Sequence, residues 1–384
     1  MKKLLIYIIF FFVTLGCKEK YLPSLTSPAT GYLVVEGFIS SGPQPTSISL
    51  TRTTKLYDAT NIIYEHKAIV NIESENHTTF QLFENGNGVY ISSSLNLNKN
   101  EKYRLQIKTR DNKEYASDFI RVKGTPEIDS ISWKRENAGV RIYINTHDPQ
   151  DATKYYHWKY EETWEIHSAF ESTLKYRLDP VTNKILSLVY RNPATGSPDP
   201  IFRCWSAENS TNISLGTSEK LSKDLIYLPL LFIGPSSEKL SVLYSIRVKQ
   251  YALSHEAYLF FEKMKKNTEQ VGSIFDPQPS ELQGNIHSTS NPAEPVIGYV
   301  DISEEKEQRI FISRTQLANW NFKLNCFATT IDNNVDSMNK YGKNLIPTQP
   351  VSYMGLAIKE FDAAPDFCVD CTTRGTNIKP AFWP

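Results

Sequence analysis

The chain has 384 residues, and its 42 basic residues are balanced by 42 acidic residues. A nucleic-acid-binding protein usually carries a basic face, so this balance argues against that class, and we expect no nucleic-acid partner. Aromatic residues make up 12% of the chain. Together with many Ser, Thr, Asn and Pro residues, this composition is typical of a β-rich protein that works outside the cell.

The first residues have the features of a secretory signal peptide. Lys2 and Lys3 precede an apolar run over residues 4–15. A run of this length fits a signal-peptide core and is too short to cross a bilayer of about 30 Å as a helix. Gly16 and Cys17 follow directly, and lipoprotein processing requires a small residue before the cysteine that receives the lipid.

The sequence therefore predicts a lipoprotein signal peptide over residues 1–16, with cleavage before Cys17 and lipid on its thiol. Thr14 stands where leucine is usual, so an ordinary signal peptide and an uncleaved anchor are the alternatives. Two or three acyl chains hold a protein stably at a membrane. Residues 17–30 read as a flexible tether. We expect a lipid-anchored protein of the outer membrane, displayed at the cell surface.

We predict a mainly β fold, in which residues 31–124 form an N-terminal immunoglobulin-like β-sandwich. The clearest strand signal is the alternation of residues 102–108, which places Tyr103, Leu105 and Ile107 on one face. Short strands at roughly ten-residue spacing, separated by turn residues, are typical of sandwiches. The predicted strands are 32–39, 46–52, 68–72, 79–83, 89–91, 102–108 and 114–116.

Residues 125–384 are predicted to form a larger β-rich domain that begins after the boundary signal Gly124-Thr-Pro126. Residues 179–200 hold four prolines and read as a long loop or a protruding hairpin. Residues 328–350 read as a mobile loop. The strands predicted in this domain are 128–133, 139–145, 155–160, 242–251, 297–302 and 309–312.

One prominent α-helix is predicted at about residues 254–270 of this second domain. Ser254 is a plausible N-cap, and the following apolar residues recur at helical spacing. Lysines crowd the end of the helix, where the helix dipole favours cations. Packing against a sheet is the favoured role of the apolar stripe, which consists of Ala257, Phe260, Phe261 and Met264.

The four cysteines besides Cys17 are candidates for disulfides, and we expect no free thiols in the mature protein. They are Cys204, Cys326, Cys368 and Cys371, and four cysteines permit three pairings. The last two form a CxxC motif, which is read as a redox pair, as half a zinc site, or as part of a structural disulfide. A redox CxxC normally opens a helix in a βαβ unit, whereas this one lies in a tail rich in Pro, Gly and Thr. The structural disulfide is the favoured interpretation, and we expect no metal or cofactor.

The C-terminal segment, residues 368–383, resembles the closing motif of a domain-of-unknown-function family of Bacteroidota outer-membrane lipoproteins. The resemblance extends over nearly the whole chain, from about residue 20 to 384. It implies an accessory lipoprotein that acts with a TonB-dependent outer-membrane transporter, and it brings no established catalytic residues. The other blocks that resemble the family are residues 244–251, 272–280, 284–286 and 298–299.

Residues that could carry chemistry are scattered, and each has a structural alternative. His157 and His167 read as a metal or acid/base cluster, or as polar residues of a strand. Asp148 and Asp151 read as calcium ligands, but a calcium site needs six to eight oxygen atoms, and a plain turn is favoured. Four tryptophans read as a stacking surface for a sugar or peptide, or as core residues. They are Trp133, Trp158, Trp164 and Trp205.

We therefore expect a non-catalytic binding or accessory partner of a transporter in nutrient uptake, not an enzyme. A structural or adhesive surface protein is the alternative, and a hydrolase with an unfamiliar site is a further one. The C-terminal tail is predicted to dock on the second domain, because its last eighteen residues carry unusual apolar weight in Phe367, Ile378, Phe382 and Trp383.

Replacing Cys17 with serine removes the thiol that accepts the lipid. We expect the variant to be released from the membrane or to remain unprocessed, and to incorporate no fatty-acid analogue in metabolic labelling, whereas the wild-type chain is labelled. Label that persists in the Cys17→Ser chain would refute the lipid assignment.

Overall fold

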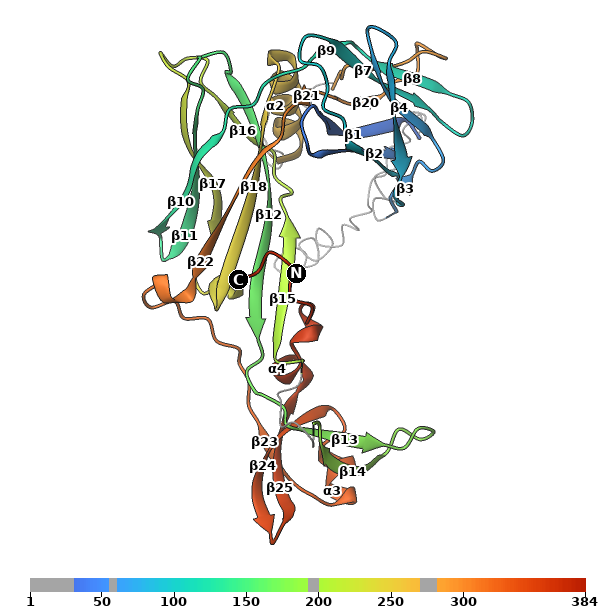
Figure 1. Cartoon of the computed structure of the whole chain (residues 1–384). Helices are drawn as coiled ribbons and strands as arrows, with labels where there is room; N and C mark the ends of the chain where they lie inside the picture. The colour runs from blue at the N-terminus through green and yellow to red at the C-terminus, as the bar shows by residue number, and fades with distance from the viewer. Residues whose placement is uncertain (1–30, 55–60, 193–199, 270–281) are drawn as a thin grey trace, which may run out of the picture.

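The computed structural model describes residues 31–54, 61–192, 200–269 and 282–384. The chain is mainly β, as the sequence predicts, and its strands form several sheets (Figure 1). Within the described residues, no helix is both long and apolar enough to cross a membrane. The predicted signal peptide, Cys17 and the tether lie outside the described residues.

The first unit is built from the strands of residues 33–121, which belong to one twelve-stranded sheet. Nine strands follow the order β19-β8-β7-β4-β5-β6-β2-β1-β20, and β3, β9 and β21 pair with β2, β7 and β1 beside this path. The inward residues predicted for 102–108 are buried. The strands of this stretch are β1 (Leu33–Ser40), β2 (Pro45–Arg52), β3 (Ile63–Tyr64), β4 (Ile69–Ser74), β5 (Thr79–Glu84), β6 (Val89–Ser94), β7 (Lys102–Lys108), β8 (Glu114–Ser117) and β9 (Ile120–Arg121).

Residues 286–303 also belong to the first unit, although they follow the predicted domain boundary by more than 150 residues. They form β19 (Ile286–Ser288), β20 (Ile297–Gly298) and β21 (Ile302–Ser303). β19 pairs antiparallel with β8, while β20 and β21 pair parallel with β1. These strands therefore cover both edges of the sheet, where unpaired backbone groups would otherwise invite other strands.

The second unit consists of two sheets that enclose a second core. One sheet has the order β10-β11-β17, and the other has the order β15-β12-β18-β22 with β16 beside β12. Tyr156, Trp158 and Tyr244 are among the buried residues between them. The strands are β10 (Ile128–Glu136), β11 (Gly139–His147), β12 (Tyr155–His167), β15 (Arg203–Asn209), β16 (Ser214–Thr217), β17 (Leu225–Ile233), β18 (Leu243–Ala252) and β22 (Lys306–Ser313).

The two units repeat one order of pairing. In the first unit, β1, β2 and β6 are neighbours on one side, and β5, β4, β7 and β8 are neighbours on the other. We number these seven strands one to seven in chain order. Strands one, two and five are then neighbours on the first side, and strands four, three, six and seven are neighbours on the other. The second unit has the same ranks, with β10, β11 and β17 opposite β15, β12, β18 and β22.

Helix α2 (His255–Glu269) follows β18 and confirms the helix predicted from the sequence. Ser254 caps it, because its Oγ accepts the backbone N–H of Ala257 at 3.1 Å. Ala257, Phe260 and Phe261 are buried. They pack with residues of both units in one apolar cluster, so the helix lies against the junction of the units.

The prediction of a mobile loop over residues 328–350 is wrong. This stretch belongs to a small distal part that contains a three-stranded sheet of the order β23-β25-β24. Pro347 and Pro350 lie within β24, where the register shifts, and they hide the alternation that marks a strand. The elements are β23 (Thr329–Asp332), α3 (Val335–Tyr341), β24 (Leu345–Met354) and β25 (Ala357–Pro365).

The distal part also takes up a hairpin from the middle of the chain. β13 (Leu174–Leu178) and β14 (Ile185–Tyr190) pair antiparallel and project from the molecule (Figure 1). Residues 193–199 of the predicted loop lie outside the described residues. Leu174 and Ile185 share a core with Ile331 and Phe361. The remaining short helices within the described residues are η2 (Glu238–Leu240), η3 (Arg314–Gln316), α4 (Asp366–Val369) and η4 (Cys371–Thr373).

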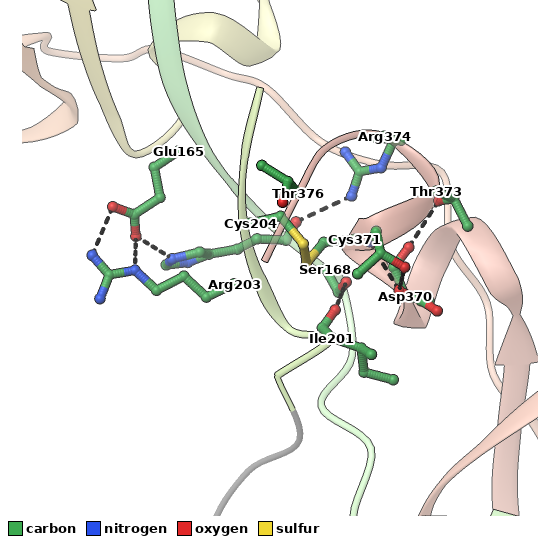
Figure 2. Close-up of a disulfide and its surroundings, with 12 residues drawn as sticks. Glu165, Ser168, Ile201, Arg203, Cys204, Asp370, Cys371, Thr373, Arg374 and Thr376 are labelled. Atoms are coloured by element: carbon green, nitrogen blue, oxygen red, sulfur yellow. Dashed lines mark hydrogen bonds and ion pairs between the residues drawn. A yellow bond between two sulfur atoms is a disulfide. The ribbon is translucent and has the colours of Figure 1, made fainter. Parts of the chain in front are cut away.

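Two disulfides connect this distal part and the C-terminal tail to their surroundings. Cys204 of β15 is bonded to Cys371 (Figure 2), and Cys326 is bonded to Cys368. The two cysteines of the CxxC motif are therefore each joined to a distant cysteine and not to each other. This supports the structural interpretation of the motif. Thr376 continues the attachment, since it exchanges two backbone hydrogen bonds of 2.8 Å with Trp205 on β15.

The tail docks on the second unit through its penultimate residue. Trp383 is 4% exposed, and its Nε1 donates a hydrogen bond of 3.0 Å to Glu165 Oε2. Its ring meets Trp205 and Phe311 edge to face. The predicted docking is confirmed for Trp383. The other three residues named in that prediction remain exposed, namely Phe367, Ile378 and Phe382.

Glu165 is the polar anchor of the docked tail. Burial raises the pKa of this carboxyl, but hydrogen bonds from His167, Arg203 and Trp383 outweigh burial and lower the pKa to about 2. Its charge is therefore present across the physiological pH range. Figure 2 shows the ion pair of Arg203 and Glu165 to one side of the Cys204–Cys371 bond.

Substituting Trp383 by alanine is expected to destabilise the protein by about 3–5 kcal/mol, because it removes a large buried side chain and leaves a cavity. Phe382→Ala is the matched control. Phe382 is 43% exposed and lies with its ring 3.7 Å from the Arg309 guanidinium, so its loss is expected to cost about 1 kcal/mol or less. Urea unfolding of both oxidised variants measures the difference, and equal costs would contradict the docking of Trp383.

Candidate binding cleft

A cleft of about 620 Å³ separates the first unit from the outer face of the second unit's larger sheet. β1 and β2 form one wall, and β12, β18 and β22 form the other. Figure 1 shows the first unit leaning over the upper end of these long strands. The two walls of the cleft therefore come from different units, and their residues lie far apart in the sequence.

The wall from the second unit carries charges of both signs in cross-strand register. Arg247 of β18 binds Glu161 of β12, with Nη2 2.6 Å from Oε2, and lies 3.4 Å from Glu307 of β22. Lys249 lies 3.2 Å from Glu161 and 3.7 Å from Glu305. Burial raises the pKa of Glu161, but the hydrogen bond from Arg247 and the charge of Lys249 outweigh it, so the pKa is lowered. The carboxylate of Glu161 is thus held in its ionised form.

Lys159 and Phe38 connect the two walls. Lys159 Nζ lies 3.7 Å from Glu36 Oε1 of the opposite unit and 5.8 Å from the centroid of the Phe38 ring. Phe38 stacks on Tyr251 at a centroid distance of 4.6 Å and on His157 at 5.4 Å. This aromatic contact fixes the distance between the walls at one side of the cleft.

A second, more apolar hollow of about 460 Å³ adjoins the first. It lies between β1, β12 and α2, and Phe260, Phe261 and Met264 of the helix line it. The two hollows share five lining residues, so they form one continuous amphipathic cleft. The shared residues are Glu36, Gly37, Phe38, Lys159 and Ser210.

His157 is part of the apolar hollow and is almost fully buried. Its side chain is 3% exposed and lies between the rings of Phe38 and Phe261. Burial, with smaller contributions from Lys159 and Lys265, lowers its pKa to about 3, so the ring is neutral at physiological pH. In the described part of the chain, its Nδ1 has no hydrogen-bond partner.

The structure does not bring the predicted histidine pair together. His157 and His167 lie ten residues apart on β12, which separates them by roughly 33 Å along an extended strand. His167 contacts Glu165 at 2.7 Å. No group of three His, Cys, Asp or Glu residues suited to a metal ion occurs among the described residues.

The other predicted candidates have structural roles. Asp148 accepts backbone N–H groups from Gln150, Ala152 and Thr153, which confirms the turn. Two of the four tryptophans, Trp158 and Trp205, are buried. Trp133 and Trp164 are partly buried against the core of the second unit.

Sequence reasoning did not identify the charged wall of the cleft. The signal was present in β18, where the buried residues alternate with Arg247 and Lys249. Such alternation shows that these cations share one exposed face. It does not reveal that another unit of the chain stands opposite that face.

Gly37 shapes the wall of the cleft that the first unit supplies. Its backbone has a φ of +142°, and a Cβ built on it would lie 2.4 Å from the carbonyl oxygen of Ser47. Only glycine adopts this conformation readily. The residue therefore lets β1 bend beside β2 at the point where the two hollows meet.

Substituting Gly37 by alanine is expected to destabilise the protein by about 1–3 kcal/mol through backbone strain. Gly124→Ala is the matched control, because a Cβ there meets nothing within 4 Å, and we expect a change within about 0.5 kcal/mol. Denaturant unfolding measures both values. Equal stability of the two variants would show that β1 can relax at Gly37.

Comparisons with known proteins identify a family. No curated protein matches the chain. Among solved structures, a segment of two fibronectin type III domains from chicken tenascin is 13% identical and covers 59% of this chain and 91% of its own, with a TM-score of 0.17, which is too low to support a conclusion. The family described as a domain of unknown function (DUF4249) matches residues 18–309; the C-terminal motif lies beyond them. Since this match covers most of the chain, the protein belongs to the DUF4249 family.

Proposed function

We propose that this protein is a lipid-anchored, non-catalytic binding protein of the outer membrane. In this proposal it faces the cell surface and acts as the accessory partner of a TonB-dependent transporter in nutrient uptake. The signal peptide and Cys17 support the anchor, and the resemblance of the sequence blocks to transporter-associated lipoproteins supports the partner. The observation that carries the binding role is the amphipathic cleft between the two units.

The geometry of the cleft favours binding over catalysis. Its carboxylates contact cations, as Glu161 contacts Arg247 and Lys249. A general acid needs a raised pKa, whereas the pKa of Glu161 is lowered. A concave site with a few polar groups and an apolar end is the usual form of a ligand-binding pocket.

We also propose that the first unit is an immunoglobulin-like β-sandwich and that the second unit repeats this fold. The support is the shared order of pairing, in which three strands stand opposite four. Immunoglobulin-like domains have this kind of two-sheet arrangement, with Greek-key connections. The two-residue pairing between β5 and β6 joins the two sides of the first unit at one edge.

An adhesive or structural surface protein is the second candidate. The turn between β24 and β25 favours it, because Tyr353, Met354 and Leu356 are exposed there. Exposed apolar groups of this kind mark contact sites when they are contiguous. This candidate predicts attachment to a surface without a transporter partner.

Purification of an epitope-tagged chain from outer membranes in mild detergent tests the proposed partnership. We expect a β-barrel transporter to co-purify, and an unrelated lipoprotein with the same tag serves as the control. Recovery of the tagged chain without a transporter would contradict the accessory role. It would favour the second candidate, an adhesive or structural surface protein.

A further inference from the structure

We propose that the cleft binds peptides, with one large apolar side chain in the hollow beside α2 and charged groups along β12, β18 and β22. This inference rests on the proposed binding function, since it names the ligand class of the same cleft. The observation that supports it is that one hollow is charged and the other is apolar, although the two share lining residues.

The size of the cleft suits an oligomeric ligand. The hollows of about 620 Å³ and about 460 Å³ are each within the range of roughly 300–1,000 Å³ that holds one small-molecule ligand. A single amino acid or monosaccharide would fill only one of them. A short chain of linked units can occupy both hollows at once.

The apolar hollow is suited to one large side chain. Phe260 and Phe261 form one wall, and Met264 lies one helical turn further along α2. Methionine adapts its shape to different apolar guests. At the far rim, the backbone N–H of Ile213 donates a hydrogen bond of 2.6 Å to Glu269 Oε1, which ties the end of the helix to the loop after β15. This hollow therefore has rigid walls and one adaptable residue.

The polar hollow offers exchangeable charges of both signs. The Lys159–Glu36 pair spans 3.7 Å, and the side chains are 40% and 77% exposed. An ion pair this exposed contributes little to stability, so a ligand carboxylate can replace Glu36 and a ligand cation can replace Lys159. A peptide carries both kinds of group, as well as backbone donors and acceptors for the Ser side chains of β1 and β2 and for Gln44 in the turn between them.

Other ligand classes fit the same walls less well. Among the residues that line the polar hollow as a whole, four carboxylates stand against three cations, which disfavours nucleic acids and other polyanions. Sugars stack on open aromatic faces, but Phe38, Tyr251 and Phe261 are each 9% exposed or less and pack on one another. A fatty acid would use the apolar hollow and leave most of the charged wall unused.

Retention of defined peptides by the full mature protein in detergent tests this inference. The immobilised protein is incubated with a tryptic digest of serum albumin, and the retained peptides are identified by mass spectrometry, resynthesised and titrated. We expect peptides in which a large apolar residue lies near charged residues. A digest that passes through without any retained peptide overturns the inference.

Met264→Trp fills the apolar hollow from its rim, and Lys263→Trp adds the same side chain to an exposed position of α2 that does not line the cleft. We expect Met264→Trp to weaken peptide binding at least tenfold and Lys263→Trp to leave it unchanged. Equal binding to both variants would overturn the placement of the apolar side chain. Lys159→Glu gives an independent measurement, because the retained peptides should become richer in basic residues; an unchanged composition contradicts the charged contact.

The two proposals fail in different ways. Met264→Trp should still co-purify with the transporter, because the substitution lies inside the cleft. If the protein retains peptides but no transporter co-purifies with it, the proposed partner is wrong and the proposed ligand class stands. If a transporter co-purifies but neither the wild-type chain nor its complex with the transporter retains peptides, the proposed ligand class is wrong and the proposed partner stands.

Discussion

The contact of Phe38 with the aromatic rings of the second unit holds the two halves of this protein in one arrangement. Phe38 comes from β1, and its ring lies within 4.6–5.7 Å of the Tyr251, His157 and Phe261 rings. Burial of apolar surface is worth roughly 25 cal/mol per Å², so separating the units would expose this cluster at a substantial cost. The walls of the cleft keep their distance because this contact joins them.

The chain reinforces the contact by passing between the units more than once. After β18 it forms α2, which brings Phe261 to Phe38, and it then adds β19 to one edge of the first unit and β20 and β21 to the other. It returns to the second unit as β22. The residues that match the family end within β22, so the match includes both walls of the cleft.

The distal part is attached by covalent and apolar links. One disulfide joins Cys326, next to β23, to Cys368 of the tail, and the other joins Cys371 of the tail to Cys204 of β15. A disulfide of this kind stabilises a fold by about 2–4 kcal/mol. Trp383 then closes the tail over Glu165. Figure 1 shows the turn between β24 and β25 at the opposite end of the molecule from β1 and β2.

Patterns among neighbouring residues were enough to predict most strands of both units, the helix capped by Ser254 and the structural use of the CxxC motif. Among the residues that line the cleft, these patterns singled out only the apolar stripe of α2 and His157. They did so for other reasons, since the stripe was predicted to pack on a sheet and His157 was a candidate metal or acid/base residue. The partners of residues 286–303, the strand that holds Pro347 and Pro350, and the approach of Glu36 to Lys159 were not predictable in this way. Local periodicity depends on the chain's own neighbours, whereas these features depend on which sheet edges and faces remain open once distant elements have packed.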